Sequence, residues 1–68
     1  MRYYNKKELI DAYTDGRFSR RAGYRWLQNE IKRFPGLLET LTTLGYTEGQ
    51  RSLTQAQVRA IVEALGEP

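Results

Sequence analysis

The 68-residue chain contains neither cysteine nor histidine. Without cysteine, neither a disulfide framework nor a thiolate zinc site can stabilise the fold. Without histidine, the commonest metal ligand and the commonest general base at neutral pH are also missing. These absences argue against a metal-dependent or hydrolytic enzyme, so we expect no cofactor and no bound metal.

Long apolar runs and catalytic motifs are also missing. No apolar stretch approaches the roughly 18 residues of a membrane span, and the aromatic and basic start is not followed by the apolar region of a signal peptide. The sequence has no phosphate-binding glycine loop and no nucleophile elbow, and its carboxylates fall at expected caps, turns and helix surfaces. We therefore expect a cytoplasmic protein that has no membrane partner and is not an enzyme.

Charge is unevenly distributed along the chain. Residues 1–34 carry nine Lys/Arg against four Asp/Glu, a balance of +5, whereas residues 35–68 carry two against four, a balance of −2; the sum is the net charge of +3. A chain of this length can build only one small core, so we expect a single domain over residues 1–68. Residues 1–34 are expected to face a polyanion. The alternative is that the uneven charge is only the ordinary variation found on the solvated surface of a short chain.

Apolar periodicity predicts an all-α fold, a compact four-helix single domain. The first helix is expected over residues 6–13, with Asn5 as its N-cap and Glu8 completing a capping box. The second is expected over residues 20–33, with Ser19 as its N-cap and a proline just beyond its end. The intervening turn contains a glycine suited to positive φ.

The second half of the chain predicts two further helices and an ambiguous segment between them. A third helix is expected from residue 36 or 37 to residue 44, followed by Gly45 in the left-handed region. Its apolar stripe is predicted to contain Leu37, Leu38, Leu41 and Leu44. Residues 46–53 are interpreted either as a loop or as a short hairpin wing. A fourth helix is expected over residues 54–65, with a capping box formed by Thr54 and Gln57.

The helix over residues 20–33 has two chemically different sides. Its apolar side is predicted to contain Gly23, Trp26, Leu27, Glu30, Ile31 and Phe34. Its opposite side carries polar residues spaced i, i+4, i+7 and i+11, which are Arg21, Arg25, Gln28 and Lys32. Glycine costs a helix up to ~1 kcal/mol relative to alanine, so Gly23 predicts that another helix or the N-terminal segment crosses closely there.

The basic side of this helix predicts a helix-turn-helix-like DNA-binding protein. Cationic groups one helical turn apart can contact successive phosphates, and side-chain amides can pair with an adenine edge. The preceding turn of five or six residues is longer than the three or four of a standard helix-turn-helix. We expect duplex DNA to be contacted by Arg17, Arg20, Arg21, Arg25, Gln28, Asn29, Lys32 and Arg51, the last from the loop or wing.

Other readings of the same residues stay open. The basic residues can equally serve only to solvate a core helix, some of them paired with Asp11, Asp15 or Glu30. Trp26 is assigned to the core, whereas three tyrosines are either nucleic-acid contacts or half-buried supports, namely Tyr3, Tyr4 and Tyr24. A different class of function is a protein-interaction module or homodimer, formed through an exposed part of the C-terminal helix.

One set of residues extends over nearly the whole chain and ends in a distinctive run: Lys6-Lys7-Glu8-Leu9, Trp26, Ile31, Pro35, Leu38, Leu41, Gly45-Tyr46, Arg51, Leu53-Thr54, Gln57-Val58, Ile61-Val62 and Leu65-Gly66-Glu67-Pro68. In these residues the chain resembles a domain-of-unknown-function family of short Bacteroidales proteins. It departs from that family at Gln55, where a proline is usual, and in the turn of residues 13–17. The resemblance implies a compact helical domain in a bacterial setting, including that of mobile elements, and no activity.

The order of elements also resembles winged helix-turn-helix proteins of the excisionase and MerR type. In those proteins a DNA-recognition helix is followed by an arginine-bearing wing and then by a further helix. Here the same order is given by residues 20–33, residues 46–53 and residues 54–65. The helix expected near residues 37–44 is additional. By fold-level analogy, this second resemblance implies a regulatory or mobile-element DNA-binding protein.

Overall fold

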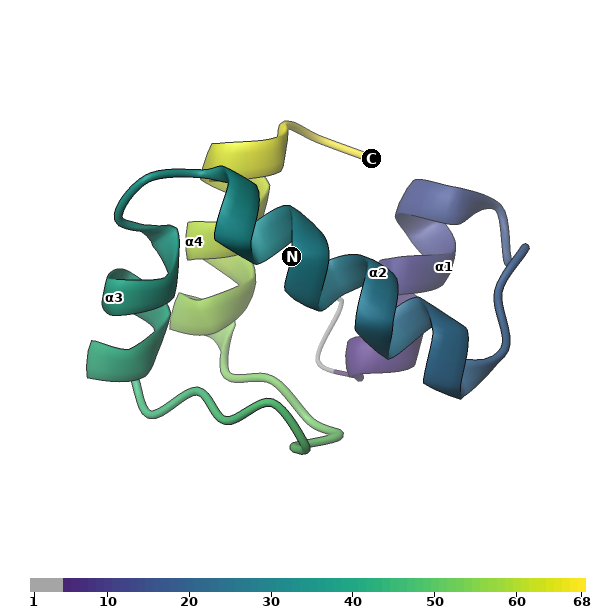
Figure 1. Ribbon diagram of the computed structural model, residues 1–68, viewed down its shortest axis with the longest axis horizontal. Coiled ribbons are helices and arrows are strands. Elements are labelled where there is room, and N and C mark those ends of the chain that lie inside the picture. Colours follow the sequence, from purple (N-terminus) through teal and green to yellow (C-terminus); the bar gives the residue numbers. More distant parts are fainter. Residues whose placement is uncertain (1–4) are drawn as a thin grey trace.

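The computed structural model describes residues 5–68, so the predictions for Tyr3 and Tyr4 lie outside the described residues. The described chain forms four helices, which confirms the all-α prediction (Figure 1). They are α1 (Lys6–Thr14), α2 (Arg20–Arg33), α3 (Leu37–Thr43) and α4 (Gln55–Leu65). No helix of this part of the chain is long and apolar enough to cross a membrane.

Side-chain caps fix where three of the helices begin. The Asn5 side chain accepts hydrogen bonds from the first amides of α1, and the Ser19 side chain accepts one from the first turn of α2. Thr54 and Gln57 form the predicted reciprocal capping box at α4. The predicted capping box at α1 is wrong in one half, because the Glu8 carboxylate makes no hydrogen bond back to Asn5.

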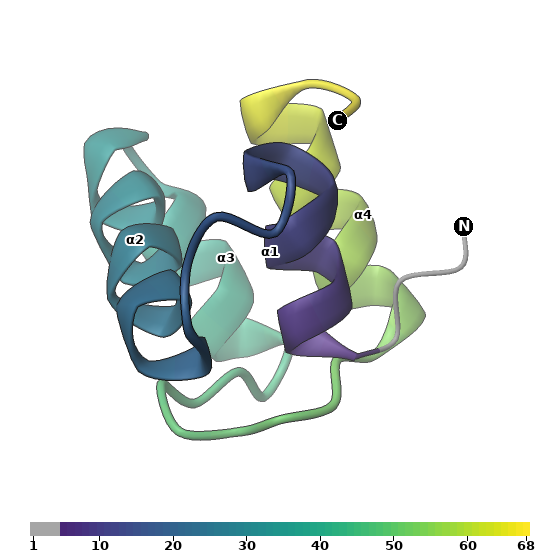
Figure 2. The ribbon, with the colours of Figure 1, turned by 90° about the vertical axis from the view of Figure 1, so that its right-hand side faces the viewer.

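Helix α2 crosses the molecule and packs against α1 at one end and α3 at the other, while α3 packs against α4 (Figure 1). The connector over residues 15–19 runs back along the helices, so α1 and α2 begin at the same end of the molecule (Figure 2). Asp15 and Gly16 turn the chain with φ values of 56° and 69°. This connector differs from the tight turn of a standard helix-turn-helix.

Residues 46–53 form a loop rather than a hairpin wing. The only ladder contact within the described residues is an isolated antiparallel bridge between Asn5 and Ser52. The backbone amide of Lys6 donates to the Arg51 carbonyl at 2.7 Å. The loop therefore lies against the start of α1, and its apolar end residues, Tyr46 and Leu53, are buried.

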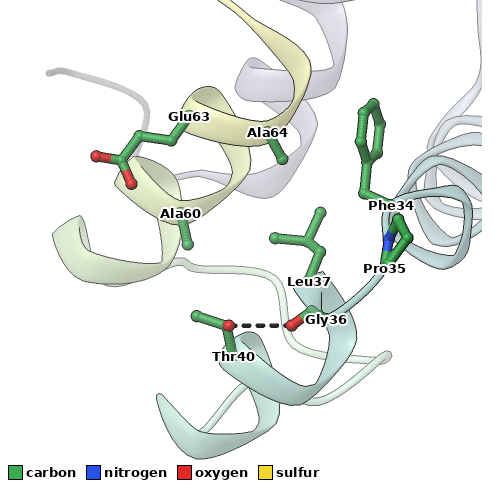
Figure 3. A pocket seen from close by; sticks show the side chains of 8 residues that line it. All are labelled: Phe34, Pro35, Gly36, Leu37, Thr40, Ala60, Glu63 and Ala64. Atoms are coloured by element: carbon green, nitrogen blue, oxygen red, sulfur yellow. Dashed lines mark hydrogen bonds between the residues drawn. The ribbon is translucent and has the colours of Figure 1, made fainter.

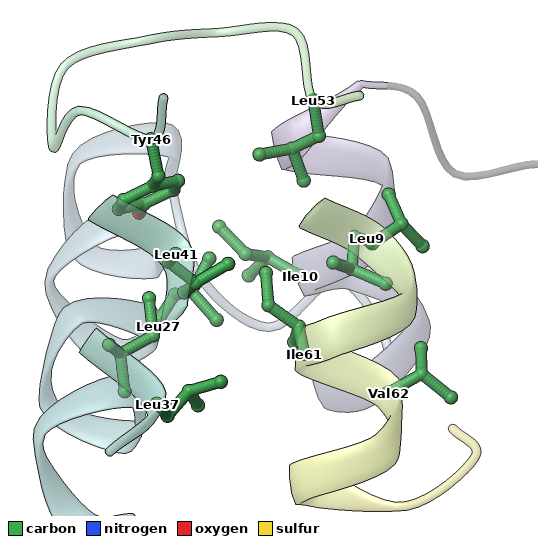
Figure 4. Close-up of a cluster of buried hydrophobic side chains, with 11 residues drawn as sticks. Leu9, Ile10, Leu27, Leu37, Leu41, Tyr46, Leu53, Ile61 and Val62 are labelled. Carbon is green, nitrogen blue, oxygen red and sulfur yellow. The ribbon is translucent and has the colours of Figure 1, made fainter. Parts of the chain in front are cut away.

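All four helices contribute to one apolar core (Figure 4). Its buried members are Leu9, Ile10, Leu27, Ile31, Leu37, Leu41, Tyr46, Leu53, Val58, Ile61 and Val62. Gly23 permits the close approach that its position predicts, because an added Cβ would lie 2.9 Å from Ile10 Cγ2. Trp26 is partly buried, and its ring centroid lies 6.0 Å from that of Tyr13, which agrees with its assignment to the core.

The predicted apolar stripe of α3 is half wrong. Leu37 and Leu41 are buried, but Leu38 and Leu44 are 41% and 37% exposed. Leu38 is turned about 100° from Leu37 around the helix, and Leu44 lies beyond its last helical residue. With only seven residues, α3 has room for one pair of core-facing leucines.

Candidate nucleic-acid interface

The two sides of α2 are placed as the sequence predicts. Gly23, Leu27 and Ile31 are buried, and the candidate contact residues of the opposite side, except Gln28, face solvent. The exposed candidates are Arg17, Arg20, Arg21, Arg25, Asn29, Lys32 and Arg51, while Gln28 is partly buried. This arrangement directs the cationic groups of α2 outward.

The candidate cations form no ion pair with a carboxylate of the described residues. The two ion pairs within residues 5–68 join Lys7 to Asp11 at 2.8 Å and Arg33 to Glu30 at 3.2 Å. Neither involves any of the eight candidate residues. The alternative in which Arg21, Arg25 or Lys32 pairs with Asp11, Asp15 or Glu30 is therefore wrong, because Asp11 pairs with Lys7 and Glu30 pairs with Arg33.

A first hollow of about 380 Å³ lies between α2 and the loop. We name it the Glu48 hollow, and it is lined by Arg21, Tyr24, Arg25, Gln28, Asn29, Lys32 and Glu48. Five of the eight candidate residues thus share one concave surface. Sequence reasoning missed Glu48, because nothing local to residues 46–53 indicates that the loop faces α2.

A second hollow, of about 370 Å³, lies where α1 and α2 begin. We name it the Arg51 hollow, and it is lined by Asn5, Lys7, Glu8, Arg20, Tyr24 and Arg51. The fold therefore brings Arg51 of the loop beside Arg20 of the helix. Tyr24 lines both hollows, so the two form adjoining parts of one surface.

Arg17 is the one candidate that lies apart. It belongs to the connector between α1 and α2, and its Nε donates to the Thr14 carbonyl at 3.2 Å. It lines neither the Glu48 hollow nor the Arg51 hollow. Any contact that Arg17 makes with a polyanion is therefore peripheral to this surface.

A buried lysine lies beneath the two hollows. Lys6 is only 1% exposed, and its Nζ lies 4.4 Å from the ring centroid of Tyr24 and 4.8 Å from that of Tyr46. The same Nζ donates to the Glu48 carbonyl at 2.6 Å. Cation–π contacts and this hydrogen bond partly replace the water that the ammonium group loses on burial.

Burial also shifts the pKa values of two residues in this cluster. Desolvation lowers the pKa of Lys6 from 10.5 to about 8, although the Glu48 carboxylate acts in the opposite direction. Desolvation raises the pKa of Tyr46 from 10.0 to about 12, with smaller contributions from Glu48 and Tyr24. The Tyr46 hydroxyl has no hydrogen-bond partner within the described residues.

A third hollow lies on a different part of the molecule, between α3 and α4 (Figure 3). It has a volume of about 450 Å³ and is mainly apolar. We name it the α3–α4 groove, and it is lined by Phe34, Pro35, Gly36, Leu37, Thr40, Ala60, Glu63 and Ala64. The C-terminal stripe itself is largely used by the core, because Val58, Ile61 and Val62 are buried.

The described residues contain no cluster of three or more acidic side chains placed to hold a metal ion.

Fold and surface together define a small all-α protein with one basic helix exposed on its outer side. The chain belongs to the family described as Domain of unknown function (DUF4248), which it matches over residues 1–68. Comparisons with curated proteins and with solved structures gave no match.

Proposed function

We propose that this protein binds duplex DNA through the basic side of α2, with Arg51 of the loop as a flanking contact. The observation that carries the proposal is the row of exposed cations on α2 that form no ion pair with any described carboxylate. Such charges release condensed counterions when they meet phosphates, which favours binding. The basic balance of residues 1–34 supports the same reading.

The length of the basic row fits the major groove. Arg21 and Lys32 are eleven residues apart, which is about 16 Å along a helix. The major groove is about 12 Å wide, so the two ends of the row can reach phosphates on its two sides. Asn29 is exposed within the row, so its amide can face a base edge, whereas the buried Gln28 Oε1, which has no hydrogen-bond partner among the described residues, must turn outward to do so.

The test is the salt dependence of binding to a mixed-sequence duplex, measured by fluorescence anisotropy from ~50 mM salt upward. Log affinity falls with log salt by about 0.9 per phosphate contact. The double variant Arg21→Ala, Arg25→Ala should reduce this slope by about 1.8, because two contacts are lost.

The matched control is the double variant Arg33→Ala, Arg59→Ala, which changes net charge equally but leaves both hollows intact. It should keep the wild-type slope. The proposal is wrong if the wild-type protein does not bind the duplex at ~50 mM salt. It is also wrong if the control lowers the slope as much as the α2 variant does.

Protein binding is a second candidate function, and the α3–α4 groove is the observation that favours it. Its lining from Phe34, Leu37, Ala60 and Ala64 is apolar, and Leu38 of α3 and Leu44 just after it add exposed apolar area. Light scattering over a wide concentration range tests the homodimer version. Ala64→Arg should abolish any dimer by placing a charge in the groove, and a strict monomer at every concentration would exclude self-association.

A further inference from the structure

The Glu48 hollow contains one acidic residue among its cations. Glu48 is exposed and lines the hollow together with Arg21, Arg25 and Lys32, yet its carboxylate forms no ion pair with any described residue. A site that binds only phosphates is not strengthened by this carboxylate, because the negative charges of a carboxylate and a phosphate repel each other. The hollow therefore combines strong donors with one strong, unused acceptor.

Lys6 holds the backbone at Glu48 in place. The Lys6 Nζ donates to the Glu48 carbonyl at 2.6 Å, and the Lys6 backbone amide donates to the Arg51 carbonyl at 2.7 Å. The ammonium group is itself held between the rings of Tyr24 and Tyr46. One buried residue thus attaches the loop to the start of α1 at two points, and holds Glu48 over one hollow and Arg51 over the other.

An arginine donor beside a carboxylate acceptor matches the major-groove edge of a C·G base pair better than that of an A·T pair. Guanine presents the acceptors O6 and N7, and its partner cytosine presents the donor N4 beside them. Arginine pairs with the first two atoms, and a carboxylate accepts from the third. In an A·T pair, the adenine amino group lies between the acceptors N7 and O4, which repel a carboxylate.

We infer that Glu48 is a specificity-determining residue that reads a C·G base pair jointly with Arg25. Glu48 accepts a hydrogen bond from cytosine N4, and Arg25 donates to guanine O6 and N7. Arg51 and Lys32 contact the phosphates on either side. This inference rests on the proposed function and names the chemical group that the Glu48 hollow recognises.

The experiment begins with selection of preferred duplexes from a random pool by the wild-type protein. The selected site should contain one fixed C·G pair, and changing it to T·A should weaken wild-type binding about tenfold or more. Glu48→Ala should reduce that discrimination by about fivefold, since the contact with cytosine N4 is lost while Arg25 still distinguishes guanine from adenine. Glu63→Ala, which removes an exposed carboxylate of the α3–α4 groove, is the control and should discriminate as the wild type does.

Two further measurements distinguish recognition of the base pair by Glu48 and Arg25 from a general repulsion of DNA by the negative charge of Glu48. Glu48→Gln keeps an acceptor oxygen but loses the charge, so it should retain part of the discrimination while binding all duplexes more tightly. Replacing the guanine with 7-deazaguanine should weaken wild-type binding, because Arg25 loses one acceptor. If this replacement has no effect on wild-type binding, the inferred contact with Arg25 is wrong.

The outcomes distinguish this inference from the proposed function. If the wild type binds DNA but selects no C·G pair, or if Glu48→Ala tightens binding to both duplexes equally with discrimination intact, only the inference is overturned. If the wild type binds no duplex, the proposed function fails and the inference fails with it.

Discussion

Lys6 is the residue whose role is least apparent from the sequence. It precedes Lys7 in the first turn of an expected amphipathic helix, where two adjacent lysines both predict solvent exposure. Its burial depends on Tyr24 and Tyr46, which lie 18 and 40 positions further along the chain. Local periodicity contains no information on such a distant pair of rings, so only the packed fold reveals this cluster.

Lys6 predicts an unusual dependence of stability on pH. Its pKa is about 8 in the folded protein and 10.5 when exposed, so between these values the unfolded chain binds more protons. The free energy of unfolding should therefore rise from pH 8 towards pH 10, by up to about 3 kcal/mol. Above pH 10 it should fall again, because the raised pKa of Tyr46 has the opposite sign.

Urea unfolding of the wild type and of Lys6→Met at several pH values between 7 and 10 measures this effect. Lys6→Met should lack the rise, whereas Lys7→Met, which removes a partly exposed neighbour paired with Asp11, should keep it. A wild-type stability that stays flat over this range would show that the ammonium group is not penalised by burial.

Gly23 is a residue whose role the sequence does predict. Gly23→Ala gains helix propensity of about 1 kcal/mol, but its Cβ would lie 2.9 Å from Ile10 Cγ2 in a fully buried contact. Overpacking of this kind costs about 1–3 kcal/mol, so we expect a net loss of about 1 kcal/mol. The control is Gly49→Ala, where an added Cβ meets no atom within 4 Å. Equal stability of the two variants in thermal unfolding would contradict the close α1–α2 contact.

At the scale of elements, helix positions were predictable and the conformation of the connections was not. Caps and helix-ending residues such as Asn5, Ser19 and Thr54 act within one turn of the chain, so the sequence alone locates them. The side that α3 turns to the core depends instead on where α2 and α4 lie. This is why Leu38 and Leu44 were assigned wrongly, and why residues 46–53 allowed both a loop and a wing.

Gln57 links the beginning of α4 to the rest of the fold. Its Oε1 accepts from the Thr54 amide at 3.0 Å and from Gln50 Nε2 at 2.8 Å, and its Nε2 donates to the Leu44 carbonyl at 2.9 Å. Gln57→Ala leaves these groups unpaired beside the core, and we expect a loss of about 2–3 kcal/mol. Gln55→Ala, at an exposed position of the same turn, should change stability by less than about 0.5 kcal/mol. Urea unfolding measures both, and similar values would show that the network contributes little.

At the scale of the whole molecule, the surface that we propose as the interface is assembled from three parts of the chain. The basic side of α2 follows from helical periodicity, and the sequence predicts it residue by residue. The contributions of Lys7 and Glu48, and the position of Arg51 beside Arg20, require the loop to fold back on α1. Long-range packing of this kind has no local signal, so this half of the candidate site emerged only from the structure.

The α3–α4 groove offers a competing surface that is spatially separate from the two basic hollows. Its lining residues are not shared with either of them. A method that reports binding residue by residue can therefore decide which surface is used. Affinity alone cannot separate these two surfaces.

The most direct measurement is an NMR titration of the ¹⁵N-labelled protein with a mixed-sequence duplex. We predict that the shifted amides cluster in residues 20–32 and 48–51, that those of Ala60 and Ala64 in the α3–α4 groove stay unchanged, and that the shifts disappear at high salt. Shifts centred on the groove, or no shifts at low salt, would contradict DNA binding through α2.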